Sequence, residues 1–260
     1  MDAHTAAVIG LAWSRGLSLH DDAAFSHAGE RVLVRDDALP GLEFVELFGA
    51  SALRGPGRLV DAAAQLPSSA FLDGTAVSAV AADRPGAGTR TASRERLAFR
   101  DHYAPAAPPG AAVPVVSRSP LDAARVLDAA PADDSRDVVR ILGASSAPGA
   151  EHDPAGAAAP DPAPPCTLVL DDGSRVALAG YAAVHHLLAD LRVVTAATFR
   201  RRGHARTIAD IAVGEALDSG LICQARIRVE SLAAAALADS LGFTDAGSRV
   251  VIVPGRAYDH

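Results

Sequence analysis

Apolar and polar positions recur with two different periods along this chain, and they predict an alternation of helices and strands. In the first hundred residues, helical spacing marks 4–16 and 58–66, and short apolar runs mark strands at 30–35 and 42–49. From residue 113 onward the predicted order is β-α-α-β-β-β-α-β-α-β. Its elements are a strand at 113–116, helices at 120–130 and 132–142, strands at 166–170, 175–184 and 191–195, a helix at 206–219, a strand at 221–229, a helix at 232–240 and a strand at 249–253.

Two segments rich in Ala, Pro and Gly divide this succession. The first is APAAPPG at 104–110, and the second is APGAEHDPAGAAAPDPAPP at 147–165. Neither offers the side chains that fill a core. We therefore expect a smaller N-terminal α/β unit at 1–103 and a second unit at 113–260 that carries a mobile surface loop at 147–165.

Composition narrows the classes of function. Hydrophobic residues make up 49% of the chain, as in globular proteins, and the formal net charge of −7 argues against a nucleic-acid partner while suiting cationic amine substrates. No apolar run approaches the about 18 residues that a membrane span requires. The two cysteines give neither a disulfide framework nor a zinc spacing, so we expect a cytoplasmic protein without a metal.

One stretch, VVTAATFRRRGHA at 193–205, places a strand, an arginine-rich turn and a helix start in succession. Main-chain N–H groups converge at a helix start, and the helix dipole adds positive charge there. Gly203 lets the backbone approach an anion closely, Ala205 is small enough to keep that approach open, and the preceding arginines supply charge-assisted hydrogen bonds. The stretch predicts a pyrophosphate site; the alternative is a solvated arginine run beside an ordinary helix start.

A second stretch, RVESLAAAALADSLGF at 228–243, joins a strand to a helix that closes with Leu-Gly-Phe. Together the two stretches resemble the GNAT acyltransferases, whose R/Q-x-x-G-x-G/A pattern falls on Arg200, Gly203 and Ala205. The resemblance covers residue 113 to the end and is strongest from residue 175. It implies an α/β (α+β) fold with a mixed, mostly antiparallel central sheet flanked by helices, and an acyl-CoA, expected to be acetyl-CoA, as cosubstrate.

The resemblance also implies that the strands at 191–195 and 221–229 splay apart around the pantetheine arm. The residues that would then contact the cofactor follow one another along the chain: Val193, Val194, Thr195, Arg200, Arg201, Arg202, Gly203, His204, Ala205, Arg206 and Thr207.

Acid and base catalysts are harder to assign. Many members of the family carry an Asn and a Tyr where this chain has Ser231 and Ala238, so the usual proton donor to the thiolate is missing. Ser231 is a candidate for that role, although it also suits the N-cap of the helix at 232–240. Asp190, or one of His185 and His186, is the candidate general base. Adjacent strand residues face opposite ways, so at most one histidine points inward and the pair is no metal site.

The sequence therefore predicts an N-acyltransferase that works by direct attack of an amine on the bound thioester. The sequence does not identify the amine acceptor, and it is compatible with a homodimer. Two alternatives stay open. One is a catalytically degenerate CoA-binding module with a regulatory role, which the missing Tyr and Asn favour. The other is a transferase that uses another acyl donor, such as an aminoacyl-tRNA.

Overall fold

The structure is a computed structural model that describes residues 1–21, 25, 27–76, 89–103, 115–132, 134–135 and 164–254. The strands are β1 (Arg31–Arg35), β2 (Leu42–Leu47), β3 (Ala50–Gly55), β4 (Thr89–Arg100), β5 (Val115–Ser117), β6 (Cys166–Val169), β7 (Arg175–Val184), β8 (Leu188–Thr195), β9 (Ile222–Arg228) and β10 (Thr244–Pro254). The helices are α1 (Ala3–Gly16), α2 (Gly57–Ala63), α3 (Ser68–Leu72), α5 (Pro120–Asp128), α7 (His204–Asp218) and α8 (Leu232–Ser240), with the 3-10 turn η1 (Ala197–Phe199).

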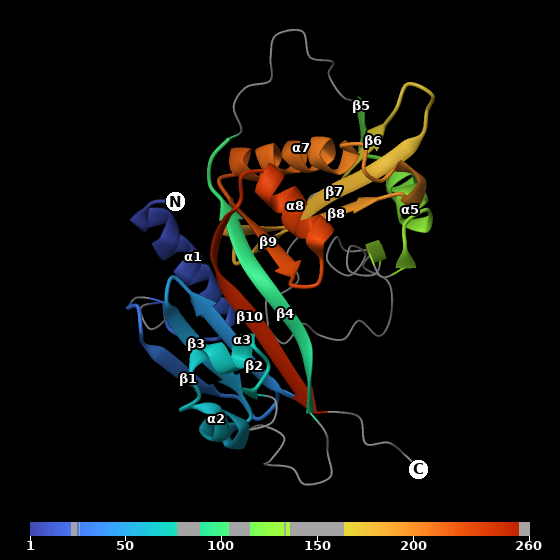
Figure 1. Cartoon of the computed structure of the whole chain (residues 1–260). Coiled ribbons are helices and arrows are strands. Elements are labelled where there is room, and N and C mark those ends of the chain that lie inside the picture. Colours follow the sequence, from blue (N-terminus) through green and yellow to red (C-terminus); the bar gives the residue numbers. More distant parts are fainter. Residues whose placement is uncertain are drawn as a thin grey trace, which may run out of the picture.

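The ten strands found in the described residues belong to one sheet in the order β1-β3-β2-β10-β4-β9-β8-β7-β6-β5. Strands β1 and β3 pair in parallel, as do β8 and β9, and the other neighbours are antiparallel. The long strands β4 and β10 run side by side through the middle of the molecule (Figure 1). They join the strands of the N-terminal region to those of the C-terminal region, and the boundary predicted near residue 103 falls within this continuous sheet.

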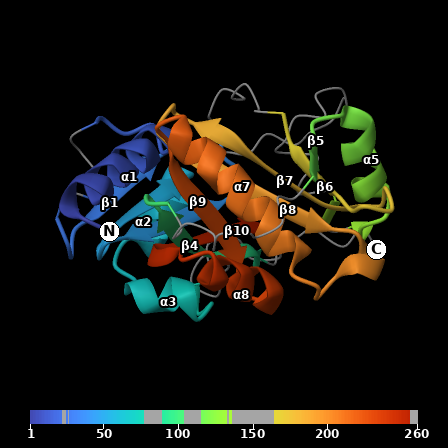
Figure 2. The same ribbon diagram turned by 90° about the horizontal axis from the view of Figure 1, so that it is seen from above.

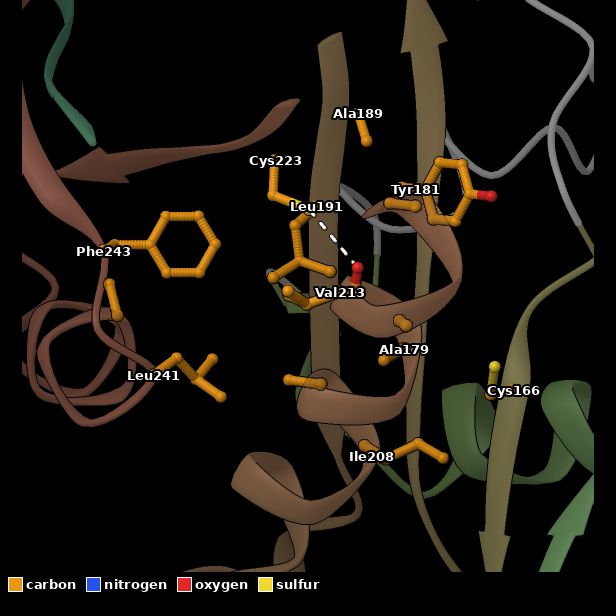
Figure 3. Packing of buried hydrophobic residues seen from close by; sticks show 14 of the residues in the cluster. Cys166, Ala179, Tyr181, Ala189, Leu191, Ile208, Val213, Cys223, Leu241 and Phe243 are labelled. Atoms are coloured by element: carbon orange, nitrogen blue, oxygen red, sulfur yellow. Dashed lines mark hydrogen bonds between the residues drawn. The ribbon is translucent and has the colours of Figure 1, made fainter. Parts of the chain in front are cut away.

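Helices cover both faces of the sheet (Figure 2). Helix α1 packs on one face, where Ile9 and Trp13 meet Leu97 of β4, and α5 packs on the same face farther along. The opposite face carries α2 and α3 over the N-terminal strands and α7 and α8 over the C-terminal strands. In Figure 3, Ile208 and Val213 of α7 point toward the strands that α7 crosses. The chain thus forms three layers, helix, sheet and helix.

Helix α1 forms where local signals agree with burial. The carboxylate of Asp2 accepts a hydrogen bond from the Thr5 backbone N–H at 2.8 Å, which caps the first turn. Ile9 and Trp13, four residues apart, then lie on one buried side of the helix. Helix α1 is therefore held on the sheet by its own apolar stripe.

The α1 face of the sheet also carries buried charge. The guanidinium of Arg249 on β10 lies 2.6 Å from Glu43 on β2 and 3.3 Å from Glu95 on β4. The side chains of Arg249 and Glu43 are only 6% and 3% exposed. Because an isolated buried charge is costly, these three groups have to be ordered together.

Most predicted elements are present with shifted ends. Strand β8 begins three residues before the predicted 191–195 and so includes Asp190. The prediction missed β3, α3 and β4. The helix predicted at 132–142 and the loop predicted at 147–165 lie outside the described residues, apart from 132, 134–135 and 164–165. Within the described part of the chain, no helix combines the length and the apolar character needed to cross a bilayer.

Candidate functional site

Strands β8 and β9 pair in parallel at three positions and then part. The paired residues, called the junction below, are Leu188 with Ile222, Ala189 with Cys223 and Asp190 with Gln224. Beyond the junction, β8 continues its pairing with β7 as far as Thr195, and β9 continues its pairing with β4 as far as Arg228. Each strand therefore turns one backbone edge toward the space between them, called the split below, at residues 191–195 and 225–228.

The chain leaves β8 through η1 and enters α7 by a tight turn. Arg201 has φ of +62° and Gly203 has φ of +85°, and Gly203 is the N-cap of α7 without a side-chain cap bond. A Cβ built on Gly203 would meet no atom within 4 Å. The first N–H groups of α7 therefore lie at a positive helix end without a side-chain acceptor from the N-cap.

The charges around this turn have the sign that an anion requires. The first turn of α7 contains no acidic residue, whereas arginines stand before and after Gly203. Arg200 forms an ion pair with Asp134, and the guanidinium of Arg202 lies 5.6 Å from the centre of the Phe199 ring. Cations at a helix N-terminus oppose its dipole, so this arrangement favours a bound anion.

A mostly antiparallel sheet with two parallel strands that part beside an arginine-rich turn and a helix N-terminus is the arrangement expected from the sequence. The fold is GNAT-like. No protein-family model and no curated protein matches the chain. Among solved structures, it is similar to a GCN5-related N-acetyltransferase from Kribbella flavida, at 17% identity over 96% of this chain and 95% of that chain, with a TM-score of 0.45.

Two further solved structures carry the same family description. A GCN5-related N-acetyltransferase from Sphaerobacter thermophilus is 12% identical over 98% of this chain and 95% of that one, with a TM-score of 0.45. An acetyltransferase of the GNAT family from Colwellia psychrerythraea is 15% identical over 69% of this chain and 61% of that one, with a TM-score of 0.42.

The predicted cofactor residues lie on β8, on the turn and at the start of α7. Val193, Val194 and Thr195 form the end of β8 beside the split. Val194 is 3% exposed and packs against α5, so its backbone and not its side chain is available. Arg201 and Arg202 are exposed on the turn, and His204, Ala205, Arg206 and Thr207 form the first turn of α7. The Thr207 N–H already donates to the Gly203 carbonyl at 3.1 Å.

Asp190 does not have the environment predicted for a general base. It is 2% exposed, and its Oδ2 atom lies 2.6 Å from Nη2 of Arg226 and 2.9 Å from Nη2 of Arg192. Burial raises the pKa of Asp190, but Arg192 and Arg226 outweigh it, so that the pKa is lowered overall. A carboxylate held in this way is a weak proton acceptor, and we remove it from the catalytic bases.

The two histidines are not on a strand, contrary to the prediction. His185 and His186 have φ of +50° and +58° and form the turn between β7 and β8, at the junction end of β8. His186 is exposed, and β8 separates it from Gly203 by about 25 Å of extended chain. Burial lowers the pKa of His185, and Arg15 lowers it further. Neither histidine borders the split beyond the junction, and we do not assign the base role to His186.

Ser231 is the N-cap of α8, as its alternative interpretation predicted. Its Oγ atom accepts a hydrogen bond from the Ala234 N–H at 3.3 Å. Accepting this bond leaves the Ser231 O–H able to donate. Ala238, which stands at the position expected for a Tyr, is buried and carries no polar side-chain group.

The face of β9 that carries Gln224 and Arg226 is largely buried. Gln224 is 3% exposed and the Arg226 side chain 13% exposed, because α1 covers this part of the sheet. The Trp13 indole N–H donates to Oε1 of Gln224 at 2.9 Å. Sequence reasoning missed this contact, since it joins residues 211 positions apart and no local pattern marks it.

Other chemistry is restricted in the described residues. Burial raises the pKa of Cys166 and of Cys223 to about 12, which keeps both thiols protonated. No group of three or more His, Cys, Asp or Glu side chains there could hold a metal. A cavity of about 310 Å³ lies at the other end of α7, beside Leu217 and Gly220, and is separate from the split.

Proposed function

We propose that the chain is an acyl-CoA-dependent N-acyltransferase that transfers an acyl group, in the first instance acetyl, to an amine by direct attack in a ternary complex. One observation carries the proposal: β8 and β9 part next to an arginine-rich helix N-terminus that has no side-chain cap. A pyrophosphate and the pantetheine arm attached to it need these two features side by side.

The turn supplies the contacts for the pyrophosphate. The N–H groups of His204, Ala205 and Arg206 lie in the uncapped first turn of α7 and would donate to phosphate oxygens. Arg201 and Arg202 would add charge-assisted hydrogen bonds from the exposed side of the turn. Gly203 leaves the room for this approach, because the space on its Cβ side is open.

The edge of β8 supplies the contacts for the reacting end. Residues 193–195 pair with β7 through one edge, and the other edge would bond the pantetheine amides. An N–H of this edge that points at the thioester carbonyl would stabilise the negative charge that develops as the amine attacks. This stabilisation needs no ionisable side chain.

Few side chains near the split are placed to transfer the protons of the proposed reaction. Ser231 is the candidate donor to the departing thiolate, because its O–H stays available while its oxygen caps α8. A thiolate with a pKa of about 8.5 also departs without full protonation. Because Asp190 is bound to two arginines, the acceptor amine would lose its proton to water.

The split and the turn also fit a second candidate, a CoA-binding module with a regulatory role. Ala238 in place of a proton donor and Asp190 bound to two arginines both weaken the catalytic machinery. In this candidate the turn and the split bind CoA as proposed, and no acyl group is transferred.

Two measurements test the proposal and separate the candidates. Calorimetry with CoA and acetyl-CoA should give binding of one molecule per chain, and release of CoA thiol from acetyl-CoA should rise when the right amine is added from a panel of small amines, antibiotics and peptides. Binding without thiol release across the panel would favour the regulatory module. Absence of binding to either form of CoA would overturn both candidates.

A further inference from the structure

Asp190 occupies a singular position in the sheet. It forms the last parallel pair of the junction, with Gln224, and both side chains lie on the face covered by α1. From the next residue on, β8 and β9 share no backbone pairing. Side-chain contacts at this last pair are therefore well placed to set the separation of β8 and β9 beyond it.

The Asp190 carboxylate, which belongs to β8, bonds one arginine of its own strand and one arginine of β9. Arg192 and Arg226 are each two residues beyond the junction, on β8 and β9 respectively, and so point to the same face as Asp190 and Gln224. Both guanidiniums donate to Oδ2 of Asp190, at 2.9 Å and 2.6 Å. The bond to Arg226 therefore joins β8 to β9 where the backbone bonds between the strands end, and the bond to Arg192 stays within β8.

Helix α1 contacts these side chains through Trp13. The Gln224 amide receives the Trp13 N–H on its oxygen at 2.9 Å and places its nitrogen 3.4 Å from Oδ1 of Asp190. With the oxygen and the nitrogen both engaged, the amide has one favourable orientation. Trp13 is 8% exposed and packs in the apolar cluster under α1, so the whole group is anchored to the N-terminal region.

We propose that Asp190 is a positioning residue, which fixes the separation of β8 and β9 and thereby the fit of the pantetheine arm in the split. This inference rests on the proposed binding of acyl-CoA. It assigns Asp190 no proton transfer, because protonating its carboxylate would break both ion pairs in a buried site. It also makes α1 part of the support of the acyl-CoA site.

The test compares two buried carboxylates. Asp190→Asn keeps the shape of the side chain and removes its charge at the split. Glu43→Gln does the same to the carboxylate that pairs with Arg249, which is equally buried but lies on β2, three strands away from β9. Both variants should lose stability in urea unfolding. Only Asp190→Asn should weaken the binding of CoA, measured by calorimetry, by about tenfold, or about 1.4 kcal/mol.

Arg226→Gln gives a second variant should Asp190→Asn fail to fold. It removes the ion pair that crosses from β9 to Asp190 on β8, while the Arg192–Asp190 pair within β8 stays. It should weaken CoA binding by about tenfold as well, or about 1.4 kcal/mol.

The outcomes separate this inference from the proposed function. If the unmodified chain binds CoA and the folded Asp190→Asn or Arg226→Gln variant binds it equally well, Asp190 has no positioning role, while the acyl-CoA site stands. If CoA affinity is unchanged and the turnover of Asp190→Asn loses its dependence on pH, Asp190 acts as a base and the inference is wrong. If the unmodified chain does not bind CoA, the proposed function and this inference fail together.

Discussion

Nη2 of Arg226 lies 2.6 Å from Oδ2 of Asp190, across the point at which β8 and β9 stop pairing. The side chains are 13% and 3% exposed, so this contact is shielded from water and from salt. Breaking a buried ion pair by removing one partner costs about 3–5 kcal/mol, because the other charge stays buried. The stability of the fold therefore depends on the charge of one carboxylate beside the proposed site.

This dependence gives a prediction for acidic pH. Burial raises the pKa of Asp190 and the two arginines lower it by more, so the folded pKa is below the ordinary value. A lowered folded pKa stabilises the fold above the unfolded pKa, and this contribution disappears as the pH falls through the folded pKa. The free energy of unfolding should therefore drop less between about pH 6 and about pH 3 in Asp190→Asn than in the unmodified chain. Equal drops in urea titrations would contradict the ion pair.

A second prediction concerns the two glycines at the ends of α7. Gly203 and Gly220 have φ of +85° and +76°, and a Cβ on either would meet no atom within 4 Å. Valine at either position should therefore destabilise the fold by a similar amount, about 1–2 kcal/mol or somewhat more. Only Gly203→Val should abolish CoA binding, because its side chain enters the space proposed for the pyrophosphate. Undiminished affinity in the folded variant would remove the site from this turn.

The exposed arginines of the turn should act through charge. Arg201→Ala and Arg202→Ala are each expected to weaken CoA binding by about five- to tenfold, the size of one exposed charge-assisted contact. The loss should shrink as salt is added, because these groups are open to solvent. Arg35→Ala, which removes an exposed arginine paired with Asp61 on the other side of the molecule, serves as the control. Calorimetry at two salt concentrations measures both effects, and a response equal to that of Arg35→Ala would exclude the two residues.

The buried charges between Glu43, Arg249 and Glu95 predict a large loss of stability. Arg249→Met keeps the length of the side chain but leaves Glu43 and Glu95 without the cation between them. We expect a loss of about 3–5 kcal/mol in the free energy of unfolding, measured in urea. Arg249→Met combined with Glu43→Leu should regain part of that loss, since the buried charge is removed together with its partner. A double variant no more stable than the single one would contradict this account.

The sequence predicted the C-terminal half of the fold well, because periodicity and local turn signals agree there. The ends of β7 and α8 were predicted without error, and the turn at Gly203 carries a local motif. Strand β4 was missed because TRTASRERLAFR reads as a charged surface segment. In the folded chain the Arg100 side chain is 3% exposed and donates to the Leu241 carbonyl at 2.7 Å, a partner 141 residues away.

The candidate site also has one part that local sequence signals mark and one part that depends on long-range contacts. Residues 193–207 are contiguous, so a local pattern was enough to propose them as a cofactor site. The environment of Asp190 depends on Trp13, Arg226 and Gln224, which come from distant parts of the chain. The identity of Asp190 suggested a proton acceptor, and only its folded surroundings identify it as one member of an ion-paired group.

The central place of β4 bears on any attempt to produce a smaller version of this protein. A fragment beginning near residue 113 would lack the strand between β9 and β10, and both would expose unsatisfied hydrogen-bonding edges. Such a fragment is expected to self-associate through these edges, and it also lacks Trp13. A failure of the fragment to bind a cofactor would therefore say nothing about the intact molecule. Expression trials, directed evolution and fusion designs should keep the first hundred residues as an integral portion of the enzyme candidate.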